Sequence, residues 1–249
     1  MSRSKSSGPL LTSLAACLAA VLSTNVQAGS FSVSPVRIFM EARERATGVT
    51  IINEGDTDLV MQAELFEWKQ KPDGTDDLQP TQDLVLAPPI LRLAKGARQV
   101  VRLANLRPPV PGEQLTYRLI VREVPEALKP AQQGVQVQVA LAFSLPIFIT
   151  PPGARRGLVC TASRLDPGVV RATCENRGQA YAQPSSMTLT TPSGNTLLSS
   201  EVKGGYILSG ITRSFDLSAD GGRIPGGPLK LQVTQDDGSK QVFDVRLAE

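Results

Sequence analysis

The sequence predicts an all-β protein built from two β-sandwich domains. Short runs rich in Val, Ile, Leu and aromatic residues recur along the chain, and Pro, Gly, Asn or Asp occupies most of the gaps, which is typical of strands joined by turns. No segment beyond the N-terminal leader has the periodicity of an amphipathic helix. Pro151–Gly153 interrupts the pattern and predicts a domain boundary, so the 249 residues divide into units of about 120 and 100 residues.

The chain opens with the pattern of a Sec-type signal peptide. Arg3 and Lys5 precede an apolar run, Leu10–Leu22, and Val26, Gln27 and Ala28 form the expected cleavage site. We expect residues 1–28 to be cleaved and the mature chain to be exported through the Sec pathway. Cys17 follows a weak lipoprotein-like box, but the apolar run before it is too short for that class of leader. No other apolar segment reaches the ~20 residues of a membrane helix, so we expect no stable membrane insertion.

The first domain is expected over residues 29–150. Its apolar runs are bounded by turn residues and are rich in the residue types that favour strands. The expected strands are Phe31–Met40, Ala46–Asn53, Leu59–Trp68, Gln99–Ala104, Gln114–Val124 and Val135–Ile149.

The last of these runs contains the most regular pattern in the chain. From Val135 to Leu145, apolar residues occupy every second position, which predicts a strand with one apolar face. This alternation is longer than the typical strand of about five to six residues. It follows a hydrophilic segment, Glu126–Gly134. Such a strand either crosses a large sheet or pairs with another molecule.

The second domain is expected over residues 151–249 and begins with a hairpin. Leu158–Leu165 and Val169–Glu175 flank the turn residues Asp166–Gly168, which brings Cys160 and Cys174 opposite each other. In an oxidising compartment we expect these cysteines to form a disulfide, because a metal site would need more ligands and the chain has no histidine. The remaining expected strands are Ser186–Thr191, Thr196–Glu201, Thr212–Leu217, Lys230–Asp236 and Lys240–Leu247. Both domains are close in size to an immunoglobulin-like sandwich.

Composition argues against catalysis and against nucleic-acid binding. Without histidine, Ser-His-Asp and Cys-His nucleophiles are impossible, and there is no Gly-rich phosphate loop. The paired carboxylates Asp76–Asp77 and Asp236–Asp237 lie in turn-like segments and are interpreted as solvated turn acids. The net charge of +3 is small and spread along the chain. We therefore expect no enzyme activity, no cofactor, no metal and no nucleic-acid partner.

Several motifs in the first domain resemble one family. They are Ser34–Phe39, the Asn53 turn followed by Gln62, Pro88–Leu93 with Gly96, Gln99–Leu103, and Tyr117 leading to Val121–Pro125. In this order they are similar to the periplasmic, PapD-like chaperones of the chaperone-usher pilus pathway. The apolar segment Phe143–Phe148 looks more like the archaic branch of that family. The resemblance implies two immunoglobulin-like domains joined by a short Pro-rich hinge.

The resemblance also implies a mechanism. Chaperones of this family lend a strand to a pilus subunit that lacks one, which is a form of β-strand addition, and deliver the subunit to an outer-membrane usher. The donor side chains would be Val135, Val137, Val139 and Leu141, with Phe143 ending the donor strand and, like Leu145, continuing into the core. The same exposed strand could pair with a second copy in a self-capping homodimer.

Two alternatives to this mechanism follow from the residues. The alternating side chains could instead all fill the core of the first domain. The protein as a whole could be a structural or adhesive exported surface protein built of immunoglobulin-like domains.

The family anchors the terminal carboxylate of its subunit on one arginine and one lysine. Arg37 matches the arginine, but Pro146 stands at the position of the lysine. A buried carboxylate needs charge-assisted donors, so we expect another cation to replace the lysine or the cleft to bind differently. The candidate cations are Arg92, Arg102, Arg118 and Arg122.

The family also joins its two domains by a glutamate, arginine and aspartate network. Glu123 and Asp220 match two of its members, whereas Thr150 stands where the arginine is expected. Arg155 or Arg156, a few residues further on, could reach the network instead.

Overall fold

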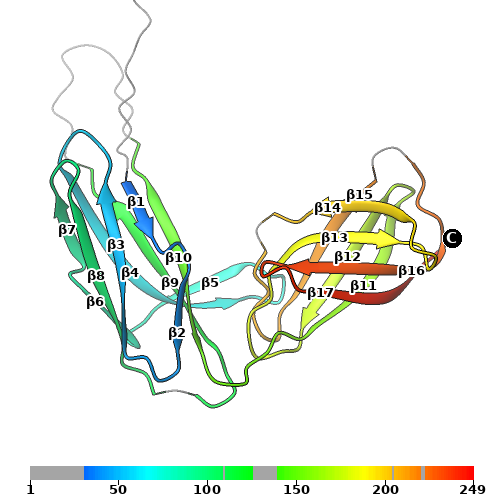
Figure 1. Ribbon diagram of the computed structural model, residues 1–249, viewed down its shortest axis with the longest axis horizontal. Coiled ribbons are helices and arrows are strands. Elements are labelled where there is room, and N and C mark those ends of the chain that lie inside the picture. The colour runs from blue at the N-terminus through cyan, green and yellow to red at the C-terminus, as the bar shows by residue number, and fades with distance from the viewer. Residues whose placement is uncertain (1–30, 109, 126–138, 204, 220–221) are drawn as a thin grey trace, which may run out of the picture.

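The computed structural model describes residues 31–108, 110–125, 139–203, 205–219 and 222–249. These residues form strands, turns and loops, and within them no helix is long and apolar enough to cross a bilayer. Strands β1–β10 form two sheets in the first half and strands β11–β17 form two sheets in the second half. The two sandwiches stand at an angle and meet at one end (Figure 1). The all-β fold class with two sandwiches is confirmed.

The first sandwich packs a smaller sheet on a larger one. The smaller sheet has the order β1-β3-β8-β6, and the larger has the order β2-β10-β9-β4-β5 with β7 also paired to β4. The core between them contains Ile51, Leu103, Tyr117 and Ile147, each essentially inaccessible to solvent. The strands are β1 Phe31–Ser34, β2 Ile38–Glu41, β3 Ala46–Asn53, β4 Leu59–Gln70, β5 Asp76–Pro80, β6 Leu84–Ala87, β7 Ile90–Leu93, β8 Arg98–Asn105, β9 Leu115–Glu123 and β10 Ala142–Thr150.

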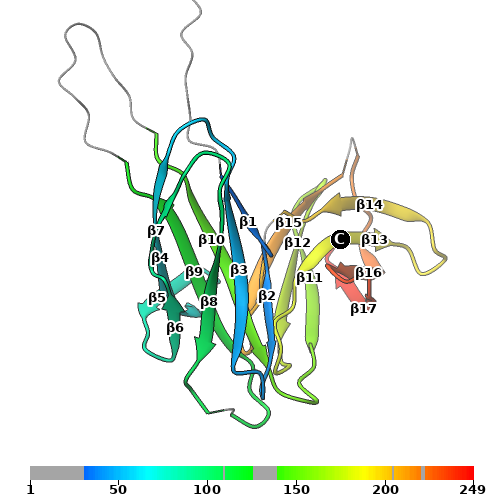
Figure 2. The same ribbon diagram turned by 60° about the vertical axis from the view of Figure 1, so that its left-hand side comes forward.

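The single strand expected over Phe31–Met40 is two strands in different sheets. β1 pairs antiparallel with β3, whereas β2 pairs parallel with β10. Pro35 lies between them and has no N–H to donate, so the first ladder cannot continue through it. The chain therefore changes sheets between β1 and β2 (Figure 2).

The strand expected over Val135–Ile149 is also shorter than predicted. β10 begins at Ala142, and the preceding Val139–Leu141 belong to no strand. Residues 135–138 lie outside the described residues. Along β10, the antiparallel pairing with β9 extends from Ala142 to Ile149, but the parallel pairing with β2 covers only Ile147–Thr150.

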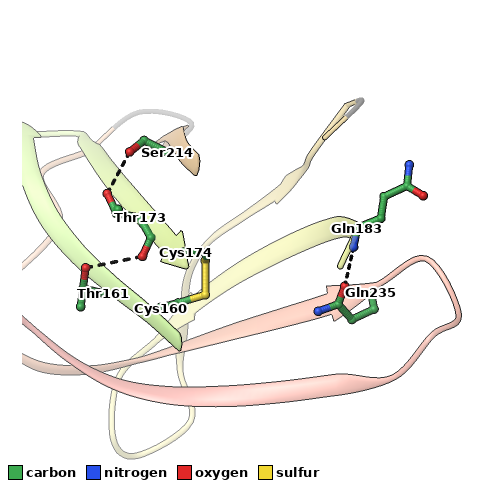
Figure 3. The surroundings of a disulfide bond; sticks show 7 residues. All are labelled: Cys160, Thr161, Thr173, Cys174, Gln183, Ser214 and Gln235. Atoms are coloured by element: carbon green, nitrogen blue, oxygen red, sulfur yellow. Dashed lines mark hydrogen bonds between the residues drawn. A yellow bond between two sulfur atoms is a disulfide. The ribbon is translucent and has the colours of Figure 1, made fainter. Parts of the chain in front are cut away.

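The second sandwich consists of the sheets β11-β12-β15 and β14-β13-β16-β17. The expected hairpin is present, and Cys160 and Cys174 are direct cross-strand partners joined by a disulfide with 4.1 Å between their Cα atoms (Figure 3). This confirms the predicted disulfide. The strands are β11 Leu158–Asp166, β12 Val169–Asn176, β13 Pro184–Thr190, β14 Thr196–Glu201, β15 Thr212–Ser218, β16 Gly227–Gln235 and β17 Lys240–Leu247.

A small aromatic cluster packs where the two sandwiches meet. Trp68 and Phe148 come from the first domain, and Tyr181 and Leu208 come from the second. The ring of Phe148 stacks on Tyr181 with 4.0 Å between centroids. Gln114 adds hydrogen bonds across the joint, because its backbone N–H donates to Gln179 and its side-chain Oε1 accepts from the N–H of Tyr181. Apolar burial and hydrogen bonds therefore both connect the two domains at this joint.

Candidate functional site

The first candidate surface is the upper part of β10, where the strand has an open edge. β9 covers one side of Ala142–Pro146, but no described strand covers the other, since β2 begins its pairing at Ile147. Unpaired N–H and C=O groups on such an edge are available to another strand. The open edge is a direct result of the change of sheets at Pro35.

Side chains on the apolar side of this segment are more exposed before Leu145 than at Leu145 itself. Leu145 is buried in the core at 3% exposure, Phe143 is 38% exposed, and Val139 is 54% exposed. Phe143 still contacts Phe31 edge-on, with 4.9 Å between ring centroids, and the half-buried Leu141 packs on the core. The apolar row therefore starts inside the sandwich and leads out of it.

The structure places only part of the expected donor strand. Val139, Leu141 and Phe143 are described, whereas Val135 and Val137 lie outside the described residues. The interpretation of Leu145 as a core residue agrees with its burial.

The second candidate surface is the joint, where Arg37 reaches the second domain. Arg37 lies between β1 and β2, and its Nη1 donates to Asp236 Oδ2 at 2.7 Å and to Gln183 Oε1 at 3.2 Å. Burial acts to lower the pKa of Arg37, but Tyr206 and the Asp236 carboxylate outweigh it, so the pKa is raised. The predicted anchor arginine is thus already engaged with a carboxylate, and that carboxylate belongs to the same chain.

Two more groups from the second domain approach the same carboxylate. Arg156 Nη1 lies 2.8 Å from Asp236 Oδ1 and 3.1 Å from Asp237 Oδ2. The Tyr181 hydroxyl donates to Asp236 Oδ2 at 3.2 Å. Burial of Tyr181, followed by the nearby Asp236 charge, raises the pKa of that hydroxyl, which favours the protonated, donating form.

Among the described residues, the contacts at the joint match the expected network only in part. Of the predicted members, Arg156 does reach an aspartate at the joint, but Glu123 pairs with Met61 at the opposite end of β9 from the contacts made by Gln114. Asp220 lies outside the described residues. Thr150 accepts a hydrogen bond from Gln114 rather than holding an ion pair.

Asp236 was interpreted as a solvated turn acid, and this is wrong because its side chain is only 13% exposed and ion-paired. Asp76 likewise begins β5 instead of lying in a turn. No local sequence pattern indicates the ion pairs of Asp236 or the strand position of Asp76, since both depend on partners that are distant in the sequence. In the sequence, Asp236 is notable only as the first residue of the Asp-Asp-Gly segment, residues 236–238.

Arg118 is the predicted candidate that lies closest to the missing lysine. Its Cα is the direct cross-strand partner of Pro146. The guanidinium covers the ring of Trp68, 3.7 Å from the centroid, and forms an ion pair with Asp76 at 3.2 Å. Burial lowers the pKa of Arg118. The guanidinium also lies 5.6 Å from the ring centroid of Tyr206, so Arg118 contacts the second domain as well as the first.

The other three candidate cations lie elsewhere. Arg92 on β7 and Arg102 on β8 are exposed on their strands. Arg122 forms an ion pair with Glu64 at 2.5 Å on the sheet surface. None of the three is among the described contacts at the joint. In the described part of the chain there is also no group of three or more potential metal ligands.

Comparison with known families identifies the class of protein. Residues 30–155 match the family model described as the pili and flagellar-assembly chaperone, PapD N-terminal domain. The chain therefore belongs to the family of PapD-like pilus chaperones, which are periplasmic proteins and not enzymes. The match confirms the membership of this family that the sequence motifs indicated.

Individual relatives are distant. The chaperone protein LpfB of Salmonella typhimurium is 22% identical over 146 residues, and the match covers 58% of this chain and 60% of that relative. Among solved structures, the CsuC–CsuE chaperone–tip subunit pre-assembly complex from the archaic Csu pili of Acinetobacter baumannii matches with a TM-score of 0.61 and 23% identity, covering 88% of this chain and 100% of that one. The E. coli chaperone DraB matches with a TM-score of 0.55 and 22% identity, covering 88% and 97%. These structures show the same fold over both domains.

Proposed function

We propose that this protein is a periplasmic chaperone that binds pilus subunits by donating a strand and delivers them to an outer-membrane usher. The observation that carries the proposal is the open edge of β10, with its row of apolar side chains leading out of the core. Family membership supports the same function. The donor strand would comprise Val135, Val137, Val139, Leu141 and Phe143.

The physical basis is β-strand addition. An incoming subunit would form main-chain hydrogen bonds along the open edge, which depend little on sequence. Its groove would bury alternate side chains, each worth on the order of 1.5–3 kcal/mol when removed from water. Before a subunit arrives, the same edge could pair with a second copy of the chain, which would cover the exposed apolar row.

Arg37 would anchor the terminal carboxylate of the subunit at the lower end of this strand. It lies just before β2, the strand that pairs with the last residues of β10. Its side chain is 38% exposed, so an incoming carboxylate can reach it. A guanidinium donates to a carboxylate through charge-assisted hydrogen bonds, which are about twice as strong as neutral ones.

We place the chain in the archaic branch of the family. The apolar Phe143–Phe148 segment supports this assignment, and the fold match to the archaic Csu complex agrees with it. The expected leader over residues 1–28 supports a periplasmic location for this chain.

The donor strand is tested by a matched pair of neighbouring substitutions. The chain is produced in a bacterial periplasm together with a pilus subunit whose gene lies next to its own, and the amount of co-purified subunit is measured. Val139→Glu places a charge in the apolar row and should reduce recovery at least tenfold. Ala140→Glu adds the same charge at an exposed position of opposite phase and should retain recovery. Equal recovery with both variants would refute strand donation.

A further inference from the structure

The carboxylate of Asp236 is held as a bound ligand would be held. It lies in the turn between β16 and β17, yet its side chain is only 13% exposed. Arg37 approaches one oxygen at 2.7 Å and Arg156 approaches the other at 2.8 Å, while the Tyr181 hydroxyl donates at 3.2 Å. These three groups come from separate segments of the chain, and they surround the Asp236 carboxylate with two positive charges and a hydroxyl, although Arg156 also pairs with Asp237.

The fit between this carboxylate and its site is incomplete. Asp236 Oδ1 and Arg156 Nη1 are both buried, and neither has a hydrogen-bond partner among the described residues despite the short distance between them. The ion pair is therefore close but poorly aligned. A buried donor without a partner is costly, so a carboxylate that could align with Arg156 would gain a hydrogen bond that Asp236 does not make.

We infer that Arg37, Arg156 and the Tyr181 hydroxyl form a carboxylate-binding site that Asp236 occupies in the free chain and that a subunit's terminal carboxylate takes over. In this arrangement Arg156 is the second cation, in place of the lysine missing at Pro146. The inference rests on the proposed function, because it needs a subunit whose terminal carboxylate reaches Arg37.

The exchange follows from electrostatics. Two carboxylates at one site repel each other, so an incoming carboxylate binds Arg37 more favourably once Asp236 has withdrawn from it. Because Asp236 occupies the site, only a fraction of the molecules can bind another carboxylate. The apparent affinity is the intrinsic affinity multiplied by that fraction. Since Arg37 belongs to the first domain and Asp236 to the second, binding would also break an ion pair between the domains.

A small carboxylate probe tests the exchange directly. The full-length mature chain is labelled with ¹⁵N and titrated with N-acetyl-phenylalanine, and the arginine Nε–Hε signals are followed by NMR. Asp236→Asn should bind the probe at least tenfold more tightly than the unaltered chain, with shifts in the signals of Arg37 and Arg156. The neutral analogue N-acetyl-phenylalaninamide should cause no such shifts. Asp244→Asn is the control and should bind like the unaltered chain, because Asp244 is exposed on β17, pairs with Lys230 and contacts neither arginine.

A second variant tests the site without altering Asp236. Arg156→Gln should reduce recovery of a co-produced subunit at least tenfold, whereas Arg155→Gln, at an exposed neighbouring position, should not. The inference is overturned if Asp236→Asn binds the probe no more tightly, or if the two arginine variants recover the subunit equally. Either result leaves strand donation intact as long as Val139→Glu still reduces subunit recovery at least tenfold, so the two proposals fail separately.

Discussion

The ring of Phe148, on β10, stacks directly on that of Tyr181 from the second domain, with 4.0 Å between their centroids. Phe148 is completely buried, although its neighbours Ile147 and Ile149 face the core of the first sandwich and it faces the other way. One strand thus contributes alternate side chains to the core and to the domain joint.

We predict that Phe148→Ala weakens the joint strongly. Removing a fully buried phenylalanine costs about 3–5 kcal/mol, because the lost burial is followed by a cavity. Phe39→Ala is the matched control: Phe39 stacks on the same two rings but is 54% exposed, so its removal should cost much less. Urea unfolding of both variants measures the difference, and equal losses would contradict the greater contribution expected from the buried ring of Phe148.

The contact between the Arg118 guanidinium and the ring of Trp68 leads to a second prediction. Arg118→Ala should lower the free energy of unfolding by about 1–2 kcal/mol, because a desolvated cation–π contact and the packing of the arginine stem are lost. Trp68 is the single tryptophan of the chain and is 1% exposed, so its fluorescence should shift to longer wavelength in the variant.

Arg122→Ala is the matched control for Arg118. Arg122 lies on the same strand, but its ion pair with Glu64 is partly exposed, and such pairs contribute about 0–1 kcal/mol. Its tryptophan fluorescence should not change. A spectrum of Arg118→Ala identical to that of the unaltered chain would contradict the assigned contact.

The three tyrosines predict the behaviour of the protein in alkali. Burial raises the pKa of Tyr117, Tyr181 and Tyr206 above the ordinary value of about 10. Since these pKa values are higher in the folded state, the stability they contribute is complete below about pH 10 and is lost as the pH rises through the folded values.

An alkaline titration followed by ultraviolet absorbance and circular dichroism measures this effect. Tyrosinate should appear only together with loss of the β-sheet signal. Tyrosinate that formed near pH 10 in a chain with unchanged circular dichroism would contradict the burial of these hydroxyls.

Local sequence patterns were sufficient for many of the strands. Runs such as Ala46–Asn53 and Lys240–Leu247 have the expected bounds, because half-buried strands need alternating apolar residues and turns need Gly, Pro, Asn or Asp. β5 was missed because Asp76–Pro80 is polar and mostly exposed, and it pairs only at the edge of a sheet. The separation of β1 from β2 was missed because Pro35 alone does not indicate which sheet follows.

The sequence by itself determined the all-β class, the disulfide, the family and the identity of Arg37 as a notable residue, because each depends on local pattern or on motifs in a fixed order. Only the tertiary structure decided which edge of β10 stays open and which carboxylate meets Arg37. The physical reason is that a strand edge is defined by the absence of a neighbour and an ion pair by the presence of one. For Arg37 and Asp236 that neighbour lies in the other domain, where no local rule of sequence reaches it.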